Sequence, residues 1–284
     1  MSSGPLKPQE ILEVSLSAAE TKAKSSFVKL AVLGFLAGAF IAFAAEGSNM
    51  AAFNLLANSA TYGLGRALAG AIFGTGLMLV VLAGGELFTG NTLMLGGVVS
   101  RRISVPGMLK NWLIVYIFNF IGSVFLAWLM FHSGLFHSSG DLLGAVTIKI
   151  AAGKTGLAFS SAFILGILCN WLVCLAVWLA YGADTMAGKI FGIFFPIWLF
   201  ITSGFEHSVA NMYYIPAGIL AKSNPEQLQQ ALSIGVSQAA IDGLNWQSFF
   251  VNNLIPVTLG NIIGGGVFVS LAYLLAYHVR KKNA

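Results

Sequence analysis

The sequence predicts an all-α integral membrane protein in which six transmembrane helices form an inverted repeat, with the second and fifth helices broken. Three observations lead to this fold class. First, the 284 residues are 57% hydrophobic and only 9% charged, whereas soluble domains carry about 25% charged residues. Second, apolar runs of about 20 residues, long enough to cross a bilayer, recur along the chain. Third, two of these runs carry a polar interruption near the middle.

The expected crossings, in chain order, are residues 27–45, 67–101, 107–132, 156–182, 188–220 and 248–279. The second and fifth are too long for one clean crossing, and segments 84–91 and 203–211 interrupt them. Backbone that leaves the helix at membrane depth is tolerated only where protein or a water-filled cavity satisfies its polar groups. Both interruptions are therefore candidate parts of a pore.

An internal repeat relates the two halves of the chain. Each interruption places Glu five residues before Asn, and the third and sixth crossings share Asn, Val, Asn and Gly at equal offsets. The matching residues are Asn111, Val115, Asn119 and Gly122 in the third crossing and Asn253, Val257, Asn261 and Gly264 in the sixth. Because each half has three crossings, the second half enters the membrane inverted. The predicted organisation is a segment at 1–26, a channel domain at 27–279 with half-repeats at about 27–132 and 156–279, and a basic tail at 280–284.

The distribution of basic residues predicts the orientation. One side receives Lys7, Lys22, Lys24, Lys29, Arg101, Arg102, Lys110, Lys189, Arg280, Lys281 and Lys282, and the opposite side receives Arg66, Lys149, Lys154 and Lys222. By the positive-inside rule, the first side and both termini are cytoplasmic. Residues 1–29 are too polar for a cleavable signal peptide. Residues 11–23 have helical apolar spacing, which suits either a helix on the membrane surface or a partly ordered tail.

Other function classes have little support in the sequence. The net charge of +5 is not gathered into the continuous basic stripe of a nucleic-acid groove. Cys169 and Cys174 fit neither a metal clamp nor a disulfide framework. The four histidines, His132, His137, His207 and His278, lie at different depths, so no metal or redox centre is expected. We therefore expect no enzyme activity, no catalytic residue, no metal and no cofactor.

Three segments resemble signatures of the formate/nitrite transporter family. They are residues 85–89 (Gly-Glu-Leu-Phe-Thr), residues 204–212 (Gly-Phe-Glu-His-Ser-Val-Ala-Asn-Met) and residues 253–266, which begin Asn-Leu-Ile-Pro-Val and end Gly-Gly-Gly. The resemblance implies an aquaporin-like protomer with six membrane helices and its own pore, assembled as a homopentamer in a prokaryotic inner membrane. It implies membrane lipid and small monovalent anions as partners, with formate, nitrite, hydrosulfide, acetate and lactate as possible cargoes.

The resemblance also assigns roles to residues at matching positions. It implies a cytoplasmic constriction at Leu77, Leu87 and Phe88, and an outer constriction at Phe73, Phe200, Asn170 and Val173. The central ionisable residue is similar to His207, and the threonine of the mobile loop to Thr89. Lys154 matches a lysine of the outer vestibule, although the loop around it differs from the family pattern.

Physical reasoning from the residues supports part of this set. His207 interrupts the fifth crossing, and an ionisable group inside a membrane is a functional candidate by default, although it could instead bond a backbone carbonyl freed by the break. Thr89 and Asn211 are expected to reach the same cavity or to satisfy loose backbone. Glu86 and Glu206 are expected to accept backbone N–H groups at the two breaks, as acidic residues do at helix N-termini.

These expectations lead to a mechanism and to alternatives. Burying a bare anion is costly, whereas its neutral acid crosses an apolar throat at lower cost. An anion could take up a proton near His207 and cross as the acid, which makes the protein a channel or proton-coupled transporter, most simply for formate. A nitrite or hydrosulfide channel remains open. A neutral-solute channel is less favoured because no paired Asn-Pro-Ala motifs occur at the breaks.

Overall fold

The computed structural model describes residues 4–277, which form helices and connecting loops and no β-strand. The first half contains α1 (Pro8–Lys24), α2 (Phe27–Ala57), α3 (Tyr62–Met78), η1 (Leu79–Gly84), α4 (Phe88–Asn91), α5 (Met94–Val99) and α6 (Val105–His132). A connecting segment holds η2 (Leu135–His137) and α7 (Leu142–Thr155). The second half contains α8 (Phe159–Gly182), α9 (Met186–Ser203), α10 (Ser208–Ala221), α11 (Pro225–Ser233), α12 (Gln238–Gly243), α13 (Trp246–Ser248), η3 (Phe249–Leu254), α14 (Ile255–Ile262), η4 (Ile263–Leu271) and α15 (Ala272–Tyr277).

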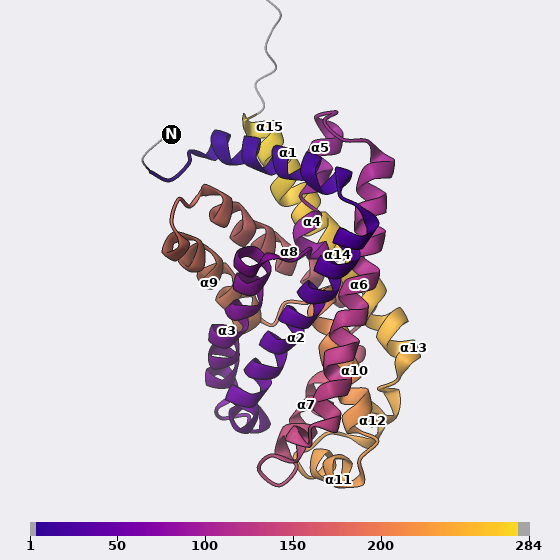
Figure 1. The fold of residues 1–284 in the computed structure, drawn as a ribbon. Coiled ribbons are helices and arrows are strands. Elements are labelled where there is room, and N and C mark those ends of the chain that lie inside the picture. Colours follow the sequence, from indigo (N-terminus) through magenta and orange to yellow (C-terminus); the bar gives the residue numbers. More distant parts are fainter. Residues whose placement is uncertain (1–3, 278–284) are drawn as a thin grey trace, which may run out of the picture.

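Six helices in the described residues are long and apolar enough to cross a membrane. They are residues 27–57, 62–84, 105–132, 159–182, 186–203 and 246–277. This confirms the six predicted crossings. The first is longer than expected, because α2 continues from residue 45 to Ala57 before Asn58 ends the helix. The extension carries polar residues, and Glu46, Ser48 and Asn49 are buried inside the bundle. Figure 1 shows the crossing helices gathered into one bundle, with α1 and α15 at one end and α11 and α12 at the other.

Both predicted helix breaks are present, and each begins at a glycine in the left-handed backbone conformation. The second crossing stops at Gly84, and the fifth stops at Gly204, each two residues before a glutamate. These glycines have φ values of +100° and +82°, a left-handed conformation that side-chain-bearing residues rarely adopt. Three residues without helical structure follow each glycine, and then α4 or α10 begins. The matching breaks confirm the inverted repeat.

The two halves also pack their outer helices in the same way. α2 lies against α6, and α8 lies against α14. A Cβ atom on Gly122 would lie 2.1 Å from the carbonyl oxygen of Phe35, and one on Gly264 would lie 2.3 Å from that of Ile167. Since real Cβ atoms do not approach so closely, only glycine allows these backbones to touch. Small residues serve this purpose widely in membrane helices.

Of the two expectations for residues 11–23, the structure shows the helix: α1 lies across one end of the bundle (Figure 1), with its apolar residues Ile11, Leu12 and Leu16 buried. Three further helices, α7, α11 and α12, were not predicted and lie between the predicted crossings. α7 packs on α10 and α11 packs on α7, so these short helices enclose the end of the bundle opposite α1. His278 and the predicted tail at 280–284 lie outside the described residues.

Candidate functional site

The first break is held by buried polar side chains around Glu86. The Glu86 carboxylate accepts from the Asn91 amide at 2.7 Å and forms an ion pair with Lys22 of α1 at 2.8 Å. The Asn91 amide also donates to the Asn111 side-chain oxygen at 2.8 Å. Asn119 of α6 accepts from the backbone N–H of Phe88 and donates to the carbonyls of Gly34 and Glu86. Together these bonds satisfy backbone that has left the helix.

The second break repeats this arrangement residue for residue. The Glu206 carboxylate accepts from Asn211 at 2.7 Å and pairs with Lys154 of α7 at 2.8 Å. The Asn211 amide also donates to the Asn253 side-chain oxygen at 2.7 Å. Asn261 accepts from the backbone N–H of Ser208 and donates to the carbonyls of Gly166 and Glu206. We call these two sets of contacts the first and second clamps.

The clamps correct one expectation. Glu86 and Glu206 were expected to accept backbone N–H groups, but the partners of their carboxylates are lysine and asparagine side chains. One backbone donor at each break, the N–H of Phe88 or Ser208, is bonded instead to the side-chain oxygen of Asn119 or Asn261. The physical reason is charge. A buried carboxylate without a cation costs several kcal/mol, so each glutamate is better placed beside a lysine.

His207 lies where the two halves meet. Its Nε2 is 2.9 Å from the Thr89 hydroxyl, a contact between the second break and the first. Its Nδ1 accepts the backbone N–H of Ala210 at 3.0 Å. Because Nδ1 is an acceptor, the ring proton sits on Nε2 and is donated to the Thr89 oxygen. The hydroxyl proton of Thr89 remains available to another acceptor.

The structure brings Asn170 into the same centre, whereas it separates Asn211 from it. The amide of Asn170 donates to the Thr89 carbonyl at 3.1 Å and to the Asn261 carbonyl at 2.7 Å, so it ties the two breaks together. Asn211, expected near His207 and Thr89, is bonded to Glu206 and Asn253 in the second clamp. Its side chain therefore supports the break.

The aromatic residues assigned to the outer constriction lie together. The rings of Phe73 and Phe200 meet edge to face with centroids 5.7 Å apart, and Phe200 stacks on His207 at 6.0 Å. Val173 on α8 is buried. Phe73 and Phe200 thus form an apolar layer on one side of the imidazole.

The residues assigned to the cytoplasmic constriction are less uniform. Leu77, Leu87 and Phe88 are all buried in the main apolar core. Phe88 also packs against Trp112 and Tyr116 of α6, at centroid distances of 5.9 and 4.8 Å, and lines an apolar groove between α6 and α14. The ring contacts of Phe88 are therefore with the flank of the bundle.

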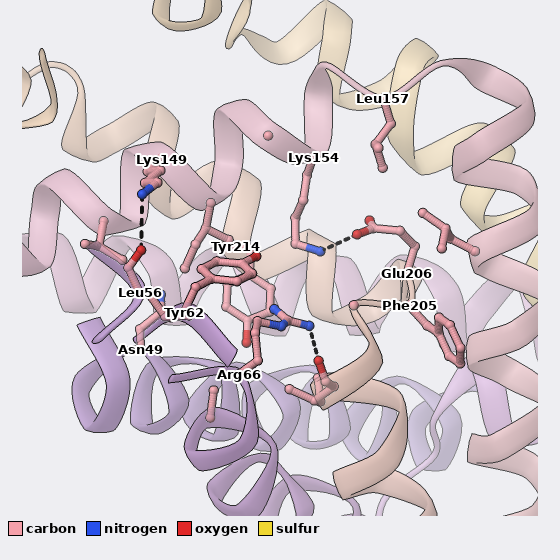
Figure 2. A pocket seen from close by; sticks show the side chains of 17 residues that line it. Asn49, Leu56, Tyr62, Arg66, Lys149, Lys154, Leu157, Phe205, Glu206 and Tyr214 are labelled. Atoms are coloured by element: carbon pink, nitrogen blue, oxygen red, sulfur yellow. Dashed lines mark hydrogen bonds and ion pairs between the residues drawn. The ribbon is translucent and has the colours of Figure 1, made fainter. Parts of the chain in front are cut away.

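A cavity of about 430 Å³ opens beside the second break, and we call it the vestibule. Figure 2 shows its wall, to which α2, α3, α7 and α10 contribute. Lys154 reaches Glu206 across it, and the Lys154 ammonium lies 5.3 Å from the ring centre of Tyr214. Within residues 4–277, no group of three or more His, Cys, Asp or Glu side chains could hold a metal ion.

Sequence reasoning missed the partners of the glutamates. Lys22 was counted only as a topology charge, and the repeated asparagines were noted without a role. The signal for the asparagines was their equal offset in the two halves. Lys22 carried the same kind of signal, because it precedes Gly34 by the 12 residues that also separate Lys154 from Gly166.

Comparison with known proteins is consistent with this architecture. The family model described as formate/nitrite transporter matches residues 9–275. A probable formate transporter of Methanothermobacter thermautotrophicus is 40% identical, over 98% of this chain and 99% of that protein. Formate channel FocA of Haemophilus influenzae is 39% identical, with 98% of each chain covered. A solved pentameric formate channel with formate bound has a TM-score of 0.75 and 36% identity, covering 89% of this chain and 98% of that one.

Proposed function

The chain belongs to the formate/nitrite transporter family, and we propose that it passes formate, together with a proton, through a separate pore in each subunit of a homopentamer. It is an integral membrane protein and a transport channel of this family, not an enzyme. The observation that carries the proposal is the contact between His207 and Thr89, one hydrogen-bonding centre shared by the two breaks. The names of two relatives, a probable formate transporter and a formate channel, support formate as the cargo.

The apolar layers on the proposed path explain why a proton is needed. Phe73, Phe200 and Val173 would flank His207 on the vestibule side, and Leu77, Leu87 and Phe88 are proposed for the opposite side. A carboxylate in such surroundings loses its hydration without replacement, whereas formic acid carries no net charge. Movement as the neutral acid is therefore the lower-energy route. Lys154 remains in the proposal as the vestibule lysine, Asn170 as the residue that joins Thr89 to the second clamp, and Asn211 as a support of the second break.

His207 and Thr89 have distinct parts in the proposed step. An anion oxygen arriving between them would accept the Nε2–H of His207 or the hydroxyl proton of Thr89. For His207 to give up a proton and remain neutral, its Nδ1 must take one from solvent, and this requires the ring to leave the Ala210 N–H. We infer that proton delivery through His207 includes a rotation of the ring. A fixed ring would act only through its electric field.

The choice of cargo is tested by flux into proteoliposomes under defined pH gradients. Formate, nitrite, hydrosulfide, acetate and lactate are compared at equal concentration, with empty liposomes as the control. The proposal expects the fastest uptake for formate, with uptake accelerated by an inward proton gradient. Faster uptake of nitrite or hydrosulfide would reassign the cargo, and uptake that ignores the gradient would remove the proton from the mechanism.

A further inference from the structure

The vestibule wall carries four charged side chains, and they are not equivalent. They are Arg66 of α3, Lys149 and Lys154 of α7, and Glu206 at the second break. Lys154 and Glu206 form an ion pair of 2.8 Å, and the Glu206 residue is only 4% exposed. The positive charge of Lys154 is therefore balanced by a carboxylate before any anion arrives.

Arg66 and Lys149 keep their charge. Arg66 donates to the backbone carbonyl of Ile201, and Lys149 donates to the carbonyls of Leu56 and Ala57 at 3.1 and 3.4 Å. A carbonyl dipole holds a cation in position without neutralising it. Among residues 4–277, neither side chain forms an ion pair with a carboxylate. The net positive charge of the vestibule thus comes from these two residues.

A hydrogen-bond donor without a partner lies in the same wall. The Asn49 residue is only 2% exposed and lines the vestibule, and its Nδ2, itself shielded from solvent, has no partner among the described residues. Buried polar atoms nearly always have a partner. Asn49 is therefore an unused donor in the vestibule wall, and rotation of its side chain would present that donor to an acceptor there.

Arg66 is also placed next to the broken segment. Its guanidinium lies 3.6 Å from where a Cβ atom on Gly204 would stand, two residues before Glu206. Figure 2 shows the charged ends of Arg66 and Lys154 beside the ring of Tyr214. That ring stacks on Phe73, a residue proposed for the outer constriction, at 6.5 Å. An anion held by Arg66 would thus wait at the entrance to the throat.

We propose that Arg66, assisted by Lys149 and Asn49, forms an anion-capture site in the vestibule for planar oxyanions such as carboxylates and nitrite. The planar guanidinium presents paired N–H groups that match two oxygens of one anion, and its bond to Ile201 fixes the direction of these N–H groups. A monatomic or spherical anion would be attracted only by the positive charge. This inference rests on the proposed function and assigns capture to Arg66, whereas Lys154 supports the second clamp.

The experiment compares the concentration dependence of uptake into proteoliposomes at low salt for wild type, Arg66→Gln, Arg66→Lys and Lys149→Gln. Lys222→Gln is the matched control, because Lys222 also bonds backbone carbonyls, those of Ile241 and Leu244, but does not line the vestibule. Focused charge raises local ion concentration by about tenfold or more. We expect Arg66→Gln to raise the formate KM about tenfold, with maximal flux within about twofold of wild type.

The other variants separate charge from shape. Arg66→Lys should raise KM for formate and nitrite and leave KM for hydrosulfide unchanged, because the positive charge remains and the paired N–H groups of the guanidinium are lost. Lys149→Gln should raise KM for all three anions, and Lys222→Gln should change none. If Arg66→Gln fails to assemble, the salt dependence of wild-type KM replaces it, with a rise expected and a flat response contradicting capture.

Two outcomes overturn different statements. If wild type carries the anions with the same KM as assembled Arg66→Gln, the capture site is wrong and the proposed function stands. If reconstituted wild type carries none of the anions, the proposed function is wrong, and the capture site, which depends on it, is wrong as well.

Discussion

The two breaks share a frame and differ in the residue that the frame holds. In both, Glu, Lys and three Asn side chains make the same set of contacts around three non-helical residues. The residue directly after the glutamate is Leu87 at the first break and His207 at the second. The common part of the repeat is therefore structural, and the functional centre lies where the halves differ.

The lysines of the two clamps belong to the shared frame. Lys22 lies in the last turn of α1, directly before the first half, and Lys154 in the last turn of α7, directly before the second. Each is 12 residues before the glycine, Gly34 or Gly166, whose carbonyl the clamp engages. The repeat therefore supplies a cation beside each glutamate by the same route at opposite ends of the bundle. This indicates that the cation is a requirement of the break itself.

The largest expected effect comes from breaking either clamp. Glu86→Leu and Glu206→Leu each leave a lysine and an asparagine amide buried without their acceptor, at a cost of about 3–5 kcal/mol. Both variants should lose most folded protein and all flux, to a similar extent, as measured by thermal unfolding in detergent. Glu226→Gln, on an exposed site of α11, is the control and should behave as wild type. A stable, active variant at one break only would end the equivalence of the clamps.

A smaller change in selectivity is expected at the residues proposed for the cytoplasmic constriction. Leu77→Ala and Leu87→Ala remove buried side chains and should widen the throat, so that lactate uptake rises several-fold relative to formate. Each truncation also costs about 2–5 kcal/mol of stability, which is measured alongside flux. Leu126→Ala in α6, equally buried but not assigned to the throat, is the control. Selectivity that changes equally in all three variants would make these leucines ordinary packing residues.

The smallest effect is expected at Gly90, beside Thr89. A Cβ atom there would meet only Val177, at an ordinary 3.7 Å, so alanine fits the folded chain. Alanine stabilises a helical backbone by about 1 kcal/mol relative to glycine. We therefore expect the flux measured at each pH to change by less than about fivefold, and the oligomer to remain assembled. Light scattering and flux measured on the same sample test this. If the oligomer is lost while the surviving protomers keep normal flux, Gly90 serves helix packing, and movement of the loop that carries Thr89 does not control the flux.

The fold was largely predictable because its signals are local. Apolar length identifies six crossings, and the breaks coincide with glycines and polar residues that interrupt those runs. Gly84 and Gly204 could be placed from sequence because a left-handed residue at a helix end is usually glycine. α7, α11 and α12 were missed because they are too short to cross a membrane, although α7 is largely apolar.

The centre of the site was less predictable, because its contacts join distant segments. His207 and Thr89 are 118 residues apart, and Asn170 on α8 joins Thr89 to Asn261 of the second clamp. Residue spacing relates Lys22 to Lys154, but the pairing of Lys22 with Glu86 depends on how α1 crosses the bundle. Individual functional residues could be suspected from their position in an apolar run, whereas their partners required the structure.

The measurement that tests the central claim most directly is proton movement coupled to formate in liposomes containing wild type or His207→Phe, followed with an entrapped pH dye. The outside is held at a pH of about 5–6, where an ordinary histidine takes up protons. The account predicts that formate carries protons inward through wild type and that His207→Phe, which keeps a ring of similar size and assembles normally, carries neither. Formate and proton uptake by His207→Phe at the wild-type rate would contradict the claim that the difference between the two breaks is the functional centre.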